Sequence, residues 1–177
     1  MDSIINRLVD IADKEIGTRE GVVNNTGARI VEYQGATWLQ PGAWPWCAAF
    51  TCWIMQEWLK EEEVRQRLNI ATFSLADKWR CRDASAFGWE KWAQQKGLTV
   101  LSKGHNAQKG DFVVYDFSHI GIVKRDQLAI NDDILTVEGN TNGLGDRDST
   151  SGDGVWEKTR HPSLVRCYIR IPGIQVV

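Results

Sequence analysis

Pro45-Trp46-Cys47-Ala48-Ala49-Phe50-Thr51-Cys52-Trp53-Ile54-Met55 is the stretch around which the rest of the chain is organised. Only Thr51 is polar between Trp46 and Met55, so we expect a helix that is covered on all sides. Proline suits the first helical position, because its missing N–H would have no partner there, and Cys47 then falls in the first turn. The N–H groups of a helix N-terminus favour a thiolate and can hold an oxyanion. Cys47 is therefore a candidate nucleophile, and a small apolar core residue is the alternative interpretation.

The composition is typical of one globular domain, which we expect to span residues 1–177. The formal net charge of −2 gives no whole-chain attraction to nucleic acid, and we expect no nucleic-acid partner. No apolar stretch approaches the length of a membrane span, so we expect no membrane insertion. Charged residues also interrupt the first segment, which predicts synthesis in the cytoplasm without a signal peptide.

The apolar periodicity changes from helical to strand-like along the chain. Helices are expected over residues 3–16, over 28–34, and from 45 to 58 or beyond, with the charged residues 60–63 as a solvated helix end. Further helices are expected from a capping box that begins at Ser74 and around residues 89–93 before Gly97. Strands are expected over residues 111–115, 120–124, 134–138, 155–159 and 164–171. Helices followed by strands predict an α+β fold with an antiparallel sheet.

A nucleophilic cysteine needs a base within reach and a group that orients the base. Among the three histidines, His119 opens a predicted strand and shares one face with Gly121 and Val123. A glycine there would let a substrate or a helix approach closely. His119 is the candidate base, and a half-buried histidine bonded to a backbone carbonyl is the alternative.

Glu138 and Asn140 end the next predicted strand and, being two residues apart, point to the same face. Either could accept a hydrogen bond from the far ring nitrogen of His119 and fix its tautomer, while the other faces the substrate or the oxyanion. A plain strand-to-turn transition is the alternative. The order of cysteine helix, histidine strand and carboxylate strand favours one shared site.

These segments together resemble a known family. Trp46-Cys47 with its apolar helix is followed by Gly110-Asp111-Phe112-Val113-Val114, Ser118-His119-Ile120-Gly121-Ile122-Val123 and Glu138-Gly139-Asn140, which look like the CHAP amidase/peptidase domain of the NlpC/P60 group of papain-like hydrolases. The segment from Glu15 to Glu20, with Asn24, Asn25 and Tyr33, is similar to the family's lead-in. The ending from Gly154 to Arg170 is similar to its last two strands.

The resemblance implies a papain-like fold in which N-terminal helices pack on a C-terminal antiparallel sheet of about five strands. It implies a peptidoglycan hydrolase that cuts an amide bond, either as an N-acetylmuramoyl-L-alanine amidase or as an endopeptidase of the stem peptide or cross-link. Cys47 would be the nucleophile, His119 the general base and acid, Glu138 the orienting carboxylate and Asn140 an accessory polar residue. The reaction would pass through an acyl-enzyme and need no cofactor.

Residues next to these segments are candidates for substrate binding: Trp46, Trp44, Ser118 and Trp156, with Trp38 as a further tryptophan of the region. Each tryptophan fits a core position equally well. The loop that follows Asn140 contains the acidic residues Asp146, Asp148 and Asp153, which lack the spacing of an EF-hand. We therefore expect this loop to form a rim of the substrate groove, and we expect no metal site. The four cysteines match no zinc pattern, and disulfides of Cys81 or Cys167 remain open.

The expected place of action is the periplasm or cell wall, including that of a target bacterium. A phage endolysin released by a holin and an antibacterial effector injected by a secretion apparatus both fit. An effector would have an immunity protein and a secretion-apparatus component as partners. Two further interpretations stay open: a papain-like acyltransferase or deamidase toxin that modifies a protein, and a non-catalytic wall-binding module in which Cys47 is a core residue.

Overall fold

Six helices precede a six-stranded antiparallel sheet in the computed structural model, which describes residues 3–143 and 152–171. The helices are α1 (Ser3–Lys14), α2 (Ala28–Gly35), α3 (Cys47–Lys60), α4 (Glu62–Arg67), α5 (Phe73–Trp79) and α6 (Ala86–Gln95). The strands are β1 (Thr99–Ser102), β2 (Phe112–Tyr115), β3 (His119–Val123), β4 (Ile134–Thr141), β5 (Gly154–Arg160) and β6 (Val165–Arg170), with a short 3₁₀ turn η1 (Pro162–Leu164) before β6. This arrangement confirms the predicted α+β class.

The strands are ordered β1-β6-β2-β3-β4-β5 across the sheet. The last strand of the chain, β6, therefore lies inside the sheet and pairs with both β1 and β2. Strands β2 and β3 form a hairpin in which Tyr115 pairs with His119. Its three-residue connection ends at Ser118 with φ of 61°, the left-handed conformation that such loops use.

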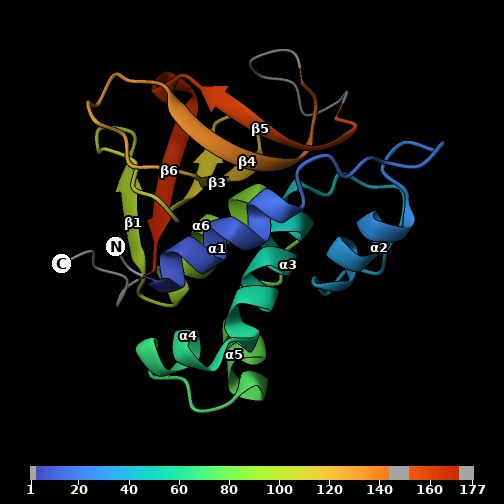
Figure 1. The fold of residues 1–177 in the computed structure, drawn as a ribbon, viewed down its shortest axis with the longest axis horizontal. Helices are drawn as coiled ribbons and strands as arrows, with labels where there is room; N and C mark the ends of the chain where they lie inside the picture. Colours follow the sequence, from blue (N-terminus) through green and yellow to red (C-terminus); the bar gives the residue numbers. More distant parts are fainter. Residues whose placement is uncertain (1–2, 144–151, 172–177) are drawn as a thin grey trace.

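The helices gather on one side of the sheet, with α3 in their midst (Figure 1). Nearly every residue of α3 from Cys47 to Leu59 is buried, as its apolar sequence predicts. Helix α1 presents one buried stripe toward the same core: Ile4, Ile5, Leu8, Val9 and Ala12. The indole Nε1 of Trp58 donates to the carbonyl of Ile4 at 2.8 Å and joins the two helices.

The two faces of the sheet have separate apolar clusters. Phe112, Val114, Ile120 and Ile122 pack in the main core with the helices. Val113, Tyr115, Val123 and Tyr168 belong to a smaller cluster on the other face. Because β2 pairs with β3, this second face is also the one on which His119 and Gly121 lie.

Three of the differences between observed and expected element boundaries have a clear local cause. Helix α3 begins at Cys47 after the N-cap Trp46, so Pro45 lies outside the helix rather than at its first position. Helix α5 begins earlier than predicted, because Thr72 and not Ser74 is the N-cap, and its side chain accepts from the N–H of Leu75. The charged residues after Lys60 form a separate helix, α4, because Glu61 is extended.

The sheet has six strands rather than about five. The additional strand, β1, lies at the edge, where Thr99 and Ser102 are exposed and the apolar signal is weak. Within the described residues, no helix combines the length and the apolar character that crossing a membrane requires.

Candidate active site

Cys47 is the first residue of α3, and its side chain is 6% exposed. The first N–H groups of a helix have no partner within the helix. The side chain of Trp46 cannot cap them, because an indole N–H only donates, and it donates to Glu20 Oε1 at 2.7 Å. Tyr33 stacks on the Trp46 ring with centroids 5.5 Å apart. The lead-in segment and α2 therefore hold the Trp46 side chain in place. The first N–H groups of α3 have no side-chain cap from Trp46.

His119 is fully buried at the start of β3, and its ring has two different surroundings. Nε2 lies 2.8 Å from Glu138 Oε2, and since an ionised carboxylate only accepts, Nε2 carries the proton that is donated. Nδ1 has no hydrogen-bond partner among the described residues. Burial lowers the pKa of His119, but the neighbouring Cys47 and then Glu138 raise it more, to about 9.

The imidazole belongs to a cluster of three nearly parallel rings, in which Tyr115 lies 6.0 Å from His119 between ring centroids. Phe117 stacks on His119 with centroids 5.7 Å apart and an interplanar angle of 10°. Tyr115 stacks on Phe117 at 5.4 Å. These residues come from the β2–β3 hairpin, so its tight connection sets the orientation of the ring. Ser118, the predicted substrate contact in this connection, is exposed.

Glu138 is fully buried on β4 and both of its carboxylate oxygens are bonded. Oε1 accepts from the Tyr115 hydroxyl at 2.8 Å and from the Thr136 hydroxyl at 2.7 Å. Oε2 accepts from His119 and from Arg160 Nη2, the latter at 2.5 Å. Burial by itself raises the pKa of Glu138, but His119 and Arg160 together hold it well below the usual range. Glu138 is thus a permanently charged acceptor.

Arg160 is a site residue that the sequence interpretation missed. It ends β5, is 1% exposed and reaches Glu138 through Nε and Nη2. Its guanidinium also lies 5.5 Å from the Tyr115 ring centroid. The available signal was indirect: a buried carboxylate requires an opposite charge, but nothing local marks which arginine supplies it.

Two glycines make the close approaches in this region. A Cβ on Gly121 would lie 2.6 Å from Glu138 Cγ, so the glycine next to His119 accommodates the carboxylate side chain. This differs from the expectation of a substrate or a helix at that position. The helix approaches Gly139 instead, where a Cβ would lie 2.6 Å from Phe50 Cβ and 2.8 Å from Trp46 Cζ3.

Asn140 is buried and adopts φ of 54°. The pairing of β4 with β5 shifts between Glu138 and Thr141, so the regular alternation of the strand does not continue through Asn140. The partner of His119 is consequently Glu138 and not Asn140. The Asn140 Nδ2 group has no hydrogen-bond partner among the described residues, which leaves a buried donor near the end of β4.

The three tryptophans expected to bind substrate have different surroundings. Trp46 is fully buried, so its side chain packs in the core, contrary to that expectation. Trp44 is half-buried and donates to the carbonyl of Gln40 at 2.9 Å. Trp156 is half-buried, with the Arg19 guanidinium 3.8 Å from its ring centroid. Trp44 and Trp156 therefore keep partial exposure, whereas Trp46 supports the helix start.

No group of three histidine, cysteine or acidic residues in segments 3–143 and 152–171 is arranged to hold a metal ion. Asp146 and Asp148 lie outside the described residues, and Asp153 accepts from the Trp156 indole at 2.8 Å. Cys81 and Cys167, for which disulfides were open, are free buried thiols, as are the other two cysteines.

Comparison of the chain with known protein families and with curated proteins finds no match. The site must therefore be judged on its own chemistry. It brings together a thiol at a helix N-terminus, a neighbouring imidazole, and a charged carboxylate bonded to Nε2 of that imidazole. This set of groups can generate a nucleophile, move a proton and stabilise an oxyanion.

Proposed function

We propose that this chain is a cysteine-dependent hydrolase of amide bonds in peptidoglycan, with a papain-like fold of the CHAP type. The observation that carries the proposal is the hydrogen bond from His119 Nε2 to Glu138 Oε2, which leaves Nδ1 free for Cys47. A catalytic base must be oriented by a third group, and Glu138 supplies that group. The choice of peptidoglycan rests on the resemblance of the motifs described above.

In the proposed reaction, the Cys47 proton already lies on His119 Nδ1 before substrate binds, since the pKa of His119 is raised to about 9, and the Cys47 thiolate attacks the amide carbonyl carbon. His119 then donates this proton to the leaving amine, whose C–N bond breaks, and an acyl-enzyme remains. Water, deprotonated by His119, attacks the thioester and releases the carboxylic acid together with the Cys47 thiolate, and His119 keeps the water proton as the imidazolium of the starting pair. A general base of this kind contributes about 10²–10⁴-fold to the rate.

The oxyanion of each tetrahedral intermediate would be held by the N–H of Cys47 and a neighbouring donor. One such donor is commonly worth about 3–4 kcal/mol of transition-state stabilisation. The absence of a side-chain cap from Trp46 supports this assignment, because a capping oxygen would compete for the N–H groups that start α3.

Arg160 fits the same mechanism through charge balance. Its guanidinium compensates Glu138, so the pair is neutral overall. The transfer of a proton from Cys47 to His119 then creates one negative and one positive charge beside an already neutral pair. Separating charge inside a buried site is least costly when no unbalanced charge remains.

The test is to incubate peptidoglycan sacculi with the wild-type protein and with Cys47→Ala, and to identify the released fragments by mass spectrometry. We expect fragments from the wild type alone, and their masses identify the bond that is cut. Cys52→Ala is the matched control, because it makes the same substitution on the same helix at a residue that contacts Asp83 rather than His119.

Activity that persists in Cys47→Ala would refute the assignment of the nucleophile. The absence of fragments from every protein, on sacculi with amidated and with unamidated stem peptides, would refute peptidoglycan hydrolysis. Acylation or a mass change of about one unit on a protein would then identify the acyltransferase or deamidase chemistry that the same pair can perform.

A further inference from the structure

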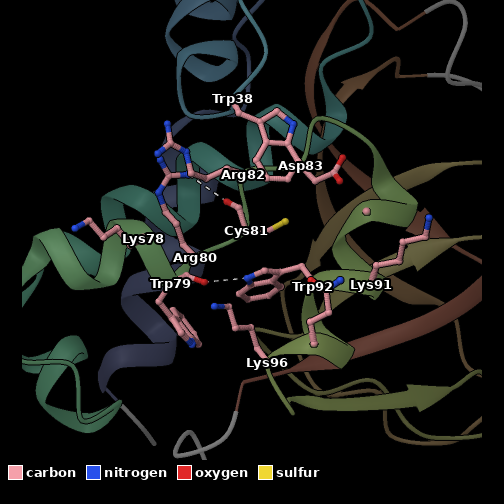
Figure 2. Close-up of a pocket in the computed structure, with 12 residues that line it drawn as sticks. Trp38, Lys78, Trp79, Arg80, Cys81, Arg82, Asp83, Lys91, Trp92 and Lys96 are labelled. Carbon is pink, nitrogen blue, oxygen red and sulfur yellow. Dashed lines mark hydrogen bonds between the residues drawn. The ribbon is translucent and has the colours of Figure 1, made fainter.

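A hollow of about 500 Å³ lies on the helical side of the molecule. Its lining comes from the end of α5, the connection between α5 and α6, α6 with the residue that follows it, and Trp38 in the connection before α3. Figure 2 shows Trp38 at one end of the lining residues and Trp79 and Trp92 at the other. Neither Cys47 nor His119 lines this hollow, so it is distinct from the candidate active site.

The charge of the lining is strongly positive. Lys78, Arg82, Lys91 and Lys96 all line the hollow, and none of the three lysines has an ion-pair partner among the described residues. Arg82 lies 3.7 Å from Asp77 and keeps 39% of its side chain exposed. These cations are therefore available to a ligand.

The two other charged residues of the lining are already engaged. Asp83 accepts from the N–H of Ser85 at 2.9 Å and is packed against Gly88, where a Cβ would lie 2.1 Å from Asp83 Cγ. Arg80 is 3% exposed and donates to the carbonyl of Ala36 at 2.6 Å and to Asp77 at 2.7 Å. The single negative charge of Asp83 does not balance the positive charges of the lining. The buried side chain of Arg80 forms part of the wall.

The aromatic wall is rigid at one end and exposed at the other. The Trp92 indole donates to the carbonyl of Trp79 at 2.9 Å and meets the rings of Trp79 and Trp89 edge-on, each at 5.5 Å. Trp38 is 67% exposed, an unusual position for a large apolar side chain. Flat indole surfaces pack against the apolar face of a sugar ring, and lysine and arginine bind carboxylate or phosphate.

We propose that this hollow binds a saccharide that carries carboxylate or phosphate groups. Single-stranded nucleic acid also uses stacking and positive charge, but it requires a groove that follows several phosphates. The cations here surround one hollow of a size typical for a small-molecule ligand. A short anionic saccharide fits this geometry better than an extended strand.

The hollow is tied to the helix of the nucleophile. The Cys52 thiol donates to the carbonyl of Asp83 at 3.5 Å, and the N–H of Trp38 donates to the carbonyl of Arg82 at 3.2 Å. Cys52 follows Cys47 by five residues, about 7.5 Å of helix rise. A saccharide held here would therefore be anchored to the same helix as Cys47. The proposal of a saccharide site rests on the proposed function only in the choice of the first probe.

The test measures binding to the Cys47→Ala protein, so that no probe can be consumed. The probes are the disaccharide of N-acetylglucosamine and N-acetylmuramic acid, which has a carboxylate; glucose 1-phosphate; neutral chitobiose; and a short oligothymidylate. Titration calorimetry at fixed ionic strength, with tryptophan fluorescence in parallel, gives each affinity. We expect saturable binding of at least one anionic saccharide at millimolar concentrations and weaker binding of chitobiose.

Two pocket variants and one control locate the site. We expect Lys91→Gln/Lys96→Gln and, separately, Trp38→Ala to weaken binding by about tenfold or more, the loss expected when charge-assisted or packing contacts disappear. Lys14→Gln/Lys103→Gln removes two exposed positive charges elsewhere and should leave the affinity unchanged. All substituted residues are exposed, and circular dichroism verifies that each variant is folded.

The proposal is overturned if neither anionic saccharide binds, if the pocket variants bind as the control does, or if oligothymidylate binds more tightly than both saccharides. The relative affinities of the carboxylate and phosphate probes identify the anionic group. Because hydrolysis of sacculi is measured separately with the wild type, failure of binding here and failure of the proposed reaction are distinguishable.

Discussion

His119 lies between Cys47 and Glu138, and both neighbours favour its protonated form enough to overcome the effect of burial. We expect the imidazole to titrate near pH 9 in the wild type. Cys47→Ala should lower this midpoint, because it removes the larger of the two favourable contributions. The measurement is an NMR titration of the His119 ring signals, compared between the wild type and Cys47→Ala.

The same shift has a defined effect on stability. The pKa of His119 is raised from 6.5 to about 9 on folding, so its contribution to the free energy of unfolding is full below about pH 6.5 and is lost as the pH rises through about 9. The thermal midpoint of the wild type should fall over this interval more steeply than that of Cys47→Ala. A wild-type midpoint of titration at 6.5 or below would contradict this account.

Arg160 compensates the charge of Glu138 in a fully buried pair. Arg160→Met would leave the carboxylate buried without its counter-charge, and we expect the free energy of unfolding to fall by about 3–5 kcal/mol. Adding Glu138→Gln should restore part of this loss, because it removes the unpaired charge. Urea denaturation gives these values.

Arg166→Met is the matched control for Arg160, since Arg166 pairs with Glu90 at the surface of strand β6. We expect no measurable change in its denaturation midpoint, because exposed ion pairs contribute little. Equal denaturation midpoints for Arg160→Met and the wild type would show that the buried pair has no stabilising role.

The nucleophile, base and carboxylate could be proposed from sequence because each has a local signal. Cys47 precedes an apolar helix, His119 opens a strand and Glu138 lies on the next one. Arg160 gave no such signal, since an arginine at a strand end normally points to solvent. The alternation of side chains along a strand does not reveal where the pairing of two strands shifts. The choice between Glu138 and Asn140 therefore also required the structure.

At the scale of secondary-structure elements, the N-cap of α5 offers a direct comparison of two candidate residues. Thr72 Oγ1 accepts from the N–H of Leu75 at 3.3 Å, whereas Ser74, the cap predicted from sequence, lies inside the helix. We expect Thr72→Ala to lower the free energy of unfolding by about 1 kcal/mol and Ser74→Ala to change it by less. Thermal melts followed by circular dichroism test this. A greater loss in Ser74→Ala would reverse the assignment.

Strand β3 depends on Gly121 to admit the side chain of Glu138. In Gly121→Ala the new methyl group would lie 2.6 Å from Glu138 Cγ and 3.1 Å from the Val137 carbonyl oxygen. We expect a loss of about 1–3 kcal/mol in the free energy of unfolding, as for other overpacked cores. Displacement of Glu138 should also lower the titration midpoint of His119.

Gly35→Ala is the control for this substitution, because a Cβ at Gly35 meets no atom within 4 Å. Its stability should equal or slightly exceed that of the wild type. An unchanged melt and an unchanged His119 titration in Gly121→Ala would show that the sheet accommodates the methyl group elsewhere.

Most elements were predictable because they bury a periodic stripe or a continuous run of apolar residues. Helix α1 has such a stripe, whereas α3, β2 and β3 are marked by apolar residues that are buried along most or all of their length. Helix α4 buries only Val64, and β1 is a half-exposed edge strand, so neither leaves a clear trace in the sequence. Tertiary contacts rather than local preference decide such elements.

At the scale of the whole molecule, the four cysteines differ in their expected reactivity. Cys47 is 6% exposed, whereas Cys52 and Cys81 are 0% exposed. Burial raises the pKa of the Cys167 thiol to about 12. Because only thiolates react readily with iodoacetamide, we expect Cys47 to be modified first in the native protein and all four cysteines after unfolding in urea.

Peptide mapping by mass spectrometry identifies the modified residue. Native protein in which Cys47 resists modification while Cys167 reacts would support the interpretation of Cys47 as an ordinary core residue. Comparison with His119→Ala shows whether the imidazole, rather than exposure alone, determines the reactivity.

The position of β6 inside the sheet, between β1 and β2, has a consequence for protein synthesis. On the ribosome, the segments that carry Cys47, His119 and Glu138 emerge before β6, which must insert between two strands made earlier. Until the chain has been translated through Arg170, β1 lacks its partner and one edge of β2 is open. A nascent chain or a prematurely terminated product that lacks β6 therefore cannot complete the sheet that supports the site.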